Sequence, residues 1–137
     1  MRNDFSAFNC KIVEYEPVAN MSIFHHILVF GCTTPGRENG IYNCGDMSTG
    51  GGSRSDSQSS SLLSDILPPC ADGEQIVYAW GMGAPPFKLP ANVSYKIGGN
   101  SPIKYLALQM HYKLAGMRYF MFPFDLYKLY IKNVYFP

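Results

Sequence analysis

The stretch IFHHILVFGC, residues 23–32, decides the fold class of this chain. It is apolar apart from its two histidines, partly β-branched, and closed by Gly31, a pattern that predicts a β-strand over residues 23–30. A second apolar stretch, YLALQMHY at residues 105–112, belongs to a longer strand that we expect over residues 103–113. Both stretches carry histidine, and His25, His26 and His111 are the only three in the sequence.

Three imidazoles on two apolar strands suggest a metal site. Imidazole suits copper, zinc, iron and nickel, and a set of three leaves a position open for a small molecule. In the second strand, Gln109 and His111 share one face, opposite a face of apolar residues, which favours a site over a filler of the core. The alternative for each histidine is a hydrogen-bonded residue of the interior, the commoner use of a buried imidazole.

The adjacency of His25 and His26 sets a geometric condition for a shared metal. Successive side chains of a regular strand point to opposite faces, so both rings reach one ion only where the strand is irregular. We therefore expect a β-bulge, a strand end or a strong local twist near His25.

The composition is that of a single domain with few charges. The chain has 137 residues, of which 47% are hydrophobic and 15% aromatic, and its formal net charge is +1. This size suits one domain with a real core, and a charge without a basic patch indicates no nucleic-acid partner. No apolar run is long enough to span a membrane, and we see no signal peptide at the N-terminus.

The cysteines indicate an oxidising compartment. They are Cys10, Cys32, Cys44 and Cys70. None belongs to a CxxC pair, which disfavours zinc knuckles and thioredoxin-like motifs, and their spacing fits disulfides better. Sequons begin at Asn20 and Asn92. We expect a secreted protein, or one in the lumen of the secretory pathway.

Short strands separated by glycine and proline predict the architecture. Further strands are expected at residues 11–15, 75–80 and 94–97, the first of them stopped by Pro17. Residues 49–69, which begin with TGGGSRSDSQSSS, indicate a Ser/Gly-rich insertion loop. The pattern favours an all-β protein, an antiparallel β-sandwich.

Several blocks of the sequence together resemble one family. They are EPVANMSIFHHILVFGC (16–32), YAWGMGAPPFKLP (78–90) and VSYKIGGNSPIKYLALQMHY (93–112). In this order they are similar to the N-terminal half of the peptidylglycine α-hydroxylating monooxygenases, which use copper and ascorbate. The related dopamine β-monooxygenases share the scheme less closely and remain the alternative within the family.

The resemblance implies a fold and a site. The fold is a jelly-roll-like β-sandwich over residues 1–113, incomplete at its C-terminal end and followed by a divergent aromatic-rich tail, residues 114–137. The site is one copper held by His25, His26 and His111. In this family that copper takes an electron from ascorbate and relays it to a second copper in the following domain. There dioxygen is activated and the α-carbon of a peptide's C-terminal glycine is hydroxylated, the first step of C-terminal amidation.

No histidine follows His111, so we expect neither the second copper site nor any catalytic residue in this chain. The glycine-extended peptide would be bound through the missing domain, and the chain alone is expected to be an incompetent enzyme. A non-enzymatic copper-binding module, or a truncated product, is the alternative function. An exposed sheet edge left by the missing strands is an aggregation hazard, which the aromatic tail either covers or worsens.

The resemblance also assigns residues around the metal site. It implies a disulfide between Cys32 and Cys70 that spans the insertion. Cys44 matches a cysteine whose partner lies upstream of residue 1, which leaves a bond between Cys10 and Cys44 as an open alternative. Gln109 matches a family glutamine and is a candidate to orient a ligand ring, against the alternative of a polar residue at a sandwich edge.

One departure from the family lies next to the histidine pair. Ile27 replaces a methionine that the family usually has at this position. A hydrocarbon side chain thereby takes the place of a soft sulfur, and no ligand is removed.

Overall fold

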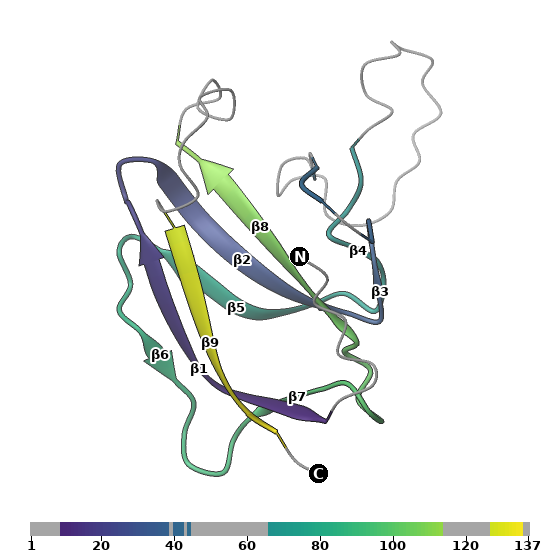
Figure 1. Ribbon diagram of the computed structural model, residues 1–137. Helices are drawn as coiled ribbons and strands as arrows, with labels where there is room; N and C mark the ends of the chain where they lie inside the picture. Colours follow the sequence, from purple (N-terminus) through teal and green to yellow (C-terminus); the bar gives the residue numbers. More distant parts are fainter. Residues whose placement is uncertain (1–8, 39, 43, 45–65, 114–126, 136–137) are drawn as a thin grey trace, which may run out of the picture.

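A computed structural model describes residues 9–38, 40–42, 44, 66–113 and 127–135 of the chain (Figure 1). All regular structure in these ranges is β, which confirms the all-β class. The strands are β1 (Cys10–Ala19), β2 (Phe24–Cys32), β3 (Thr34–Pro35), β4 (Cys70–Asp72), β5 (Gln75–Gly81), β6 (Phe87–Lys88), β7 (Tyr95–Ile97), β8 (Tyr105–Tyr112) and β9 (Tyr127–Tyr135). The described residues contain no helix long and apolar enough to cross a membrane.

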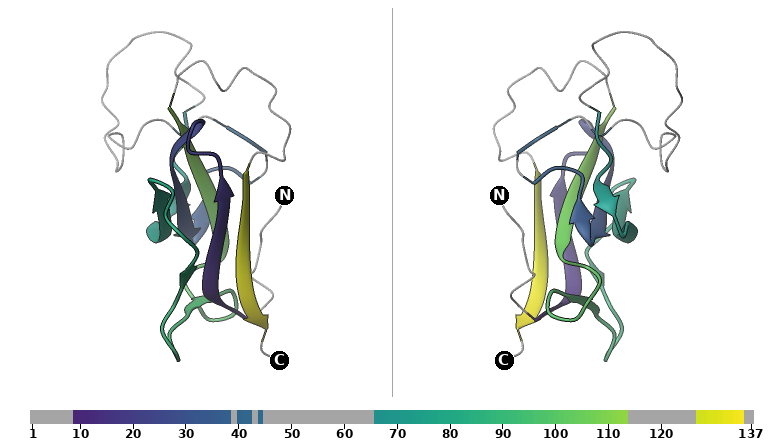
Figure 2. Two further views of the ribbon diagram at one scale, coloured as in Figure 1. Left: turned by 90° about the vertical axis from the view of Figure 1, so that its left-hand side faces the viewer. Right: turned by 90° about the vertical axis from the view of Figure 1, so that its right-hand side faces the viewer.

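The strands form two antiparallel layers, as expected for a sandwich. One sheet has the order β5-β2-β8. In the other, β1 pairs with β6 and β7 along one side and with β9 along the other (Figure 2). A small third sheet pairs β3 with β4. The histidine strands β2 and β8 are direct neighbours, and β8 is an edge strand among the described residues.

The core lies between the two main sheets, and it explains why successive side chains in both sheets alternate between core-facing and outward-facing positions. Ile27 and Val29 of β2 face it, together with Ile12 and Tyr15 of β1. The rings of Tyr15 and Tyr78 are stacked, with centroids 4.4 Å apart and planes within 4°. Leu106 and Met110 of β8 pack against the same cluster. The alternate residues of β2 and β8, among them His26 and His111, therefore face away from the core.

Four of the predicted strands appear with ends shifted by two residues or fewer, whereas β1 is twice as long as predicted. The prediction that Pro17 stops this strand was wrong. Pairing of β1 with β6 covers only Glu14 and Tyr15, while pairing with β9 continues through Pro17 to Ala19. Among the described strands, one side of β1 has no pairing partner at Pro17, and a residue without an N–H is tolerated at such an edge.

The aromatic tail contributes a strand to the sandwich. Residues 127–135 form β9, which pairs with β1 from Cys10↔Tyr135 to Ala19↔Tyr127. Leu129 and Ile131 pack against the core cluster. This part of the tail therefore covers one edge of β1 instead of leaving it open. One exposed edge at which chains could aggregate is thereby removed.

A second apolar cluster lies on the outer face of the β5-β2-β8 sheet. It consists of Leu28, Phe30, Cys32 and Cys70, with Tyr105 and Ala107 packed against it. The disulfide between Cys32 and Cys70 is present, as the resemblance implied. Nearby, the Tyr42 hydroxyl donates to the Pro68 carbonyl (3.1 Å), and the Gly36 N–H donates to the Pro69 carbonyl (2.9 Å). The last residues of the predicted insertion are thereby held against Gly36 and Tyr42, and its Ser/Gly-rich part lies outside the described residues.

The alternative bond between Cys10 and Cys44 is not formed. Cys10 is buried in β1, where it pairs with Ile97 and Tyr135. Cys44 lies against β8 of the other sheet, where its sulfur accepts a hydrogen bond from the Gln109 amide at 3.1 Å. The two cysteines thus belong to different layers of the sandwich, which explains why they are not joined.

Candidate metal centre

A β-bulge brings the three histidines together. Along β2 and β8, Phe24 pairs with Tyr112 and His26 pairs with His111, so His25 is an extra residue on β2 with no counterpart on β8. This irregularity is the kind that the adjacent histidines required. It lets His25 turn toward the face that His26 and His111 occupy.

The imidazole rings lie in contact. The Nδ1 atoms of His25 and His26 are 2.8 Å apart, so the N–H of one ring donates a hydrogen bond to the bare nitrogen of the other. The rings of His26 and His111 are stacked, with centroids 4.2 Å apart and planes at 19°. His25 is exposed, while His26 and His111 are half-buried. The cluster is thus open on the His25 side and backed by the sheet on the other.

The surroundings favour neutral rings. Burial lowers the pKa of His26, and the neighbouring rings of His111 and His25 lower it further. Each additional proton would place like charges against one another in a small space. Because metals bind the neutral imidazole, a lowered pKa keeps His26 ready for a metal at neutral pH.

The donor set fits a metal such as copper. The Nε2 atom of His26 is buried and has no hydrogen-bond partner within the described structure, an arrangement that is costly for a residue of purely structural role. Because the Nδ1 atom of His26 is already in a hydrogen bond with His25, Nε2 is the atom of this ring that remains for a metal, and the Nδ1 contact orients the ring.

The third ring needs a change of orientation. Among the described residues, no three His, Cys, Asp or Glu side chains stand as a ready ligand set. The rings of His111 and His26 are stacked, and nearly parallel rings do not direct their in-plane lone pairs at one point. A rotation of the His111 side chain toward His25 and His26 is the step that a shared metal requires.

Gln109 lies close to the cluster in the chain but has a different partner. It shares the outward face of β8 with His111, pairs with Leu28 across the ladder, and is 5% exposed. Its amide donates to the Cys44 sulfur. Gln109 thus holds Cys44 against this face of the sheet, a contact that sequence reasoning missed.

Gly81 is the other neighbour that sequence reasoning did not single out. It pairs with His26 at the end of β5. A Cβ atom at this position would lie 3.7 Å from the His26 Cβ and 3.8 Å from the His25 carbonyl oxygen. Its only signal in the sequence was its place in the YAWGMG block.

Comparison with known proteins defines the class. The model of the copper type II ascorbate-dependent monooxygenase family, N-terminal domain, matches residues 5–117. The chain belongs to this family, whose members depend on copper and ascorbate. The match extends a few residues beyond Lys113, where the resemblance of the sequence ended.

The relatives are peptide-amidating enzymes by name. Peptidyl-glycine alpha-amidating monooxygenase B of Xenopus laevis is 37% identical over 101 residues, which are 74% of this chain and 9% of the relative. Peptidylglycine alpha-amidating monooxygenase of Rattus norvegicus is 33% identical over 101 residues, 74% of this chain and 8% of the relative. The chain therefore spans less than a tenth of the length of these relatives.

Proposed function

We propose that this chain is the first-copper, electron-transfer domain of a peptidylglycine monooxygenase, and that His25, His26 and His111 hold the copper. The observation that carries the proposal is the bulge at His25, which gathers the only three histidines of the chain on one face. A bulge interrupts a ladder and re-aims a side chain, and it is common beside functional sites. Family membership supports the choice of metal.

The residues divide the work of such a site. Copper bound here supplies one-electron chemistry, with ascorbate as the reductant. The exposed ring of His25 leaves one side open for a small reductant to approach. His26 keeps a neutral ring because its pKa is lowered, and Ile27 anchors the histidine pair in the core. His111 closes the set from the neighbouring strand.

The peptide chemistry belongs to a second site. With no histidine after His111, we propose that the oxygen-activating copper is supplied by another segment or another chain. The substrate is then a glycine-extended peptide, hydroxylated at the α-carbon of its C-terminal glycine as the first step of amidation. The disulfide between Cys32 and Cys70 supports a location in the secretory lumen or outside the cell.

Copper titration tests the first part of this proposal. Purified chain is titrated with Cu(II) and followed by electron paramagnetic resonance. We expect one type 2 copper per chain, loss of its signal on addition of ascorbate, and at least tenfold weaker binding in His111→Ala. Lys96→Ala, on the other sheet, is the matched control and should bind as the wild type does. The absence of stoichiometric binding would reject the site.

A hydroxylation assay separates this function from the second candidate, a copper-binding module without enzymatic partners. The isolated chain is expected to give no peptide hydroxylation with copper and ascorbate. Addition of a chain that carries the second copper domain should restore turnover if the two parts assemble. Copper binding without any restored turnover favours the module, and turnover by the isolated chain contradicts the proposed division of labour.

A further inference from the structure

The sequon that begins at Asn92 stands on an exposed turn. Residues 89–94 connect β6 to β7, and the Val93 N–H donates to the Pro90 carbonyl at 3.0 Å to close the turn. Asn92 has a φ of 66°, in the left-handed region that asparagine tolerates better than most residues. Asn92 and Val93 are both exposed, and Val93 exposes 49% of its surface. The acceptor amide is therefore accessible in the folded chain.

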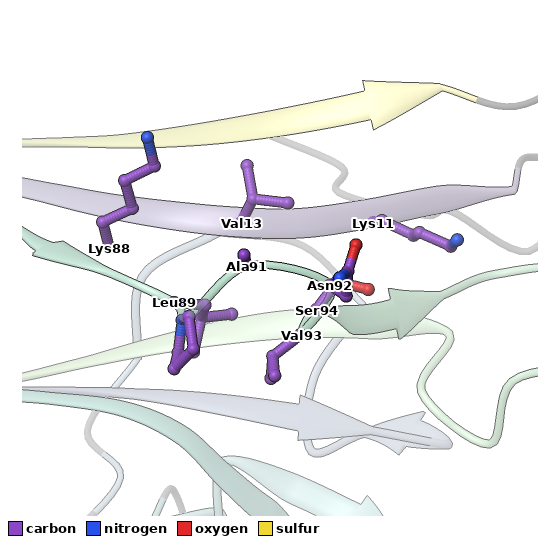
Figure 3. A pocket seen from close by; sticks show the side chains of 9 residues that line it. Lys11, Val13, Lys88, Leu89, Ala91, Asn92, Val93 and Ser94 are labelled. Carbon is purple, nitrogen blue, oxygen red and sulfur yellow. The ribbon is translucent and has the colours of Figure 1, made fainter.

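The same turn forms one wall of an open groove. Lys11 and Val13 of β1 form the other wall, and the volume is about 710 Å³ (Figure 3). This lies within the range of roughly 300–1,000 Å³ that is usual for small-ligand sites. The lining combines apolar residues, among them Val13, Leu89 and Val93, with polar Asn92 and Ser94 and with the side chains of Lys11 and Lys88. A sugar ring matches this mixture because it presents both C–H surfaces and hydroxyl groups.

The other sequon lies in a different setting. Asn20 follows the end of β1, and its side-chain oxygen accepts a hydrogen bond from the Ser22 N–H at 2.8 Å. Its carbonyl accepts from the N–H groups of Ile23 and Phe24, both at 3.0 Å. The exposed His25 comes five positions later in the chain. Asn20 is exposed like Asn92, but an oligosaccharide there would be attached close in the chain to the exposed His25.

Asn92 lies away from that cluster. Its groove uses the first half of β1, which pairs with β7, whereas the turn that holds Asn20 follows the last residue of β1. Figure 1 shows the β6–β7 connection and the β1–β2 turn at opposite ends of the sandwich. A bulky group on Asn92 thus leaves the histidines accessible.

We propose that Asn92, and not Asn20, is the site of N-linked glycosylation, and that the first N-acetylglucosamine rests in the groove beside β1. A bond forms between Asn92 Nδ2 and C1 of the sugar, Nδ2 loses a proton, and the leaving group is the lipid diphosphate of an oligosaccharide donor. The inference rests on the secretory location in the proposed function. Copper titration of protein made in bacteria does not depend on it, so the two can fail separately.

Expression in eukaryotic cells tests the site. The 137-residue chain is joined to a cleavable secretion leader, and the product is treated with peptide N-glycosidase. A mass decrease is expected for the wild type and Asn20→Gln. No decrease is expected for Asn92→Gln or for Ser94→Ala, which keeps the asparagine but removes the sequon. Three results would overturn the assignment: an untreated wild type without sugar, a decrease that persists in Asn92→Gln, or a second glycan lost in Asn20→Gln.

Thermal unfolding tests the groove. Trimming the oligosaccharide to one N-acetylglucosamine should keep the Tm of the fully glycosylated chain. Complete removal should lower the Tm by about 2 °C or more. Because the glycosidase converts Asn92 to aspartate, Asn92→Asp is the control and should match the stripped protein. Equal Tm values for all glycoforms would reject the packing of the first sugar.

Discussion

Replacing both Cys32 and Cys70 by alanine should remove a large share of the stability of this domain. The bond closes a loop with a sequence separation of 38 residues. In the chain-entropy model a loop of this length contributes about 4 kcal/mol at 25 °C. The half-cystines are 0% and 5% exposed and pack with Leu28 and Phe30, so lost packing adds to the effect. A typical domain is stable by only about 5–15 kcal/mol, so the variant should be close to unfolding.

Urea unfolding gives the measurement, with the fluorescence of Trp80 as the probe. This residue is the only tryptophan of the chain and is buried in the core. Wild type kept under a reducing agent should lose a similar amount, since the same bond is opened. Cys44→Ser, which leaves the disulfide intact and keeps an acceptor for Gln109, should change the free energy of unfolding by about 1 kcal/mol or less. A loss below about 1 kcal/mol in the double variant would refute the reasoning.

Three further predictions concern single residues. Tyr15→Phe should stabilise the domain by about 1 kcal/mol in the same urea assay. The reason is that the Tyr15 hydroxyl is buried without a hydrogen-bond partner in the described structure. A clear decrease in the free energy of unfolding would mean that the hydroxyl has a partner. Gly31→Ala should destabilise it by about 1–3 kcal/mol, since the new Cβ meets the Ile103 side chain at 2.9 Å, and an unchanged urea midpoint would contradict the packing. The metal-free chain should lose stability as the pH falls below about 6.5, because the unfolded chain binds a proton to His26 more readily than the folded one. His26→Gln should weaken this pH dependence, and an equal dependence in the variant would assign it to another group.

The sequence was sufficient for the elements whose pattern is local. The apolar runs around His26 and His111 predicted two strands that are present, and in the second run alternation also predicted that Gln109 and His111 share one face. The condition that adjacent histidines impose was also visible in advance. The sequence did not show whether a bulge, a strand end or a local twist would satisfy this condition. A bulge is defined by the pairing of β2 with β8, and pairing is a property of the whole sheet.

The elements that sequence reasoning missed depend on distant partners. β9 begins at Tyr127, and its pairing with β1 joins residues more than a hundred positions apart. Pro17 was expected to end β1, but its effect depends on whether both sides of the strand are occupied. The contact of Gln109 with Cys44 joins residues 65 positions apart and follows no local pattern.

Counting the imidazoles on bound Cu(II) by pulsed electron paramagnetic resonance tests the central claim most directly. The wild-type chain, with one copper bound, should show three imidazole nitrogens from His25, His26 and His111, and His111→Ala should show two. A copper that binds with three imidazoles in His111→Ala, or with none in the wild type, would contradict the assignment of these histidines as the ligands of a single copper.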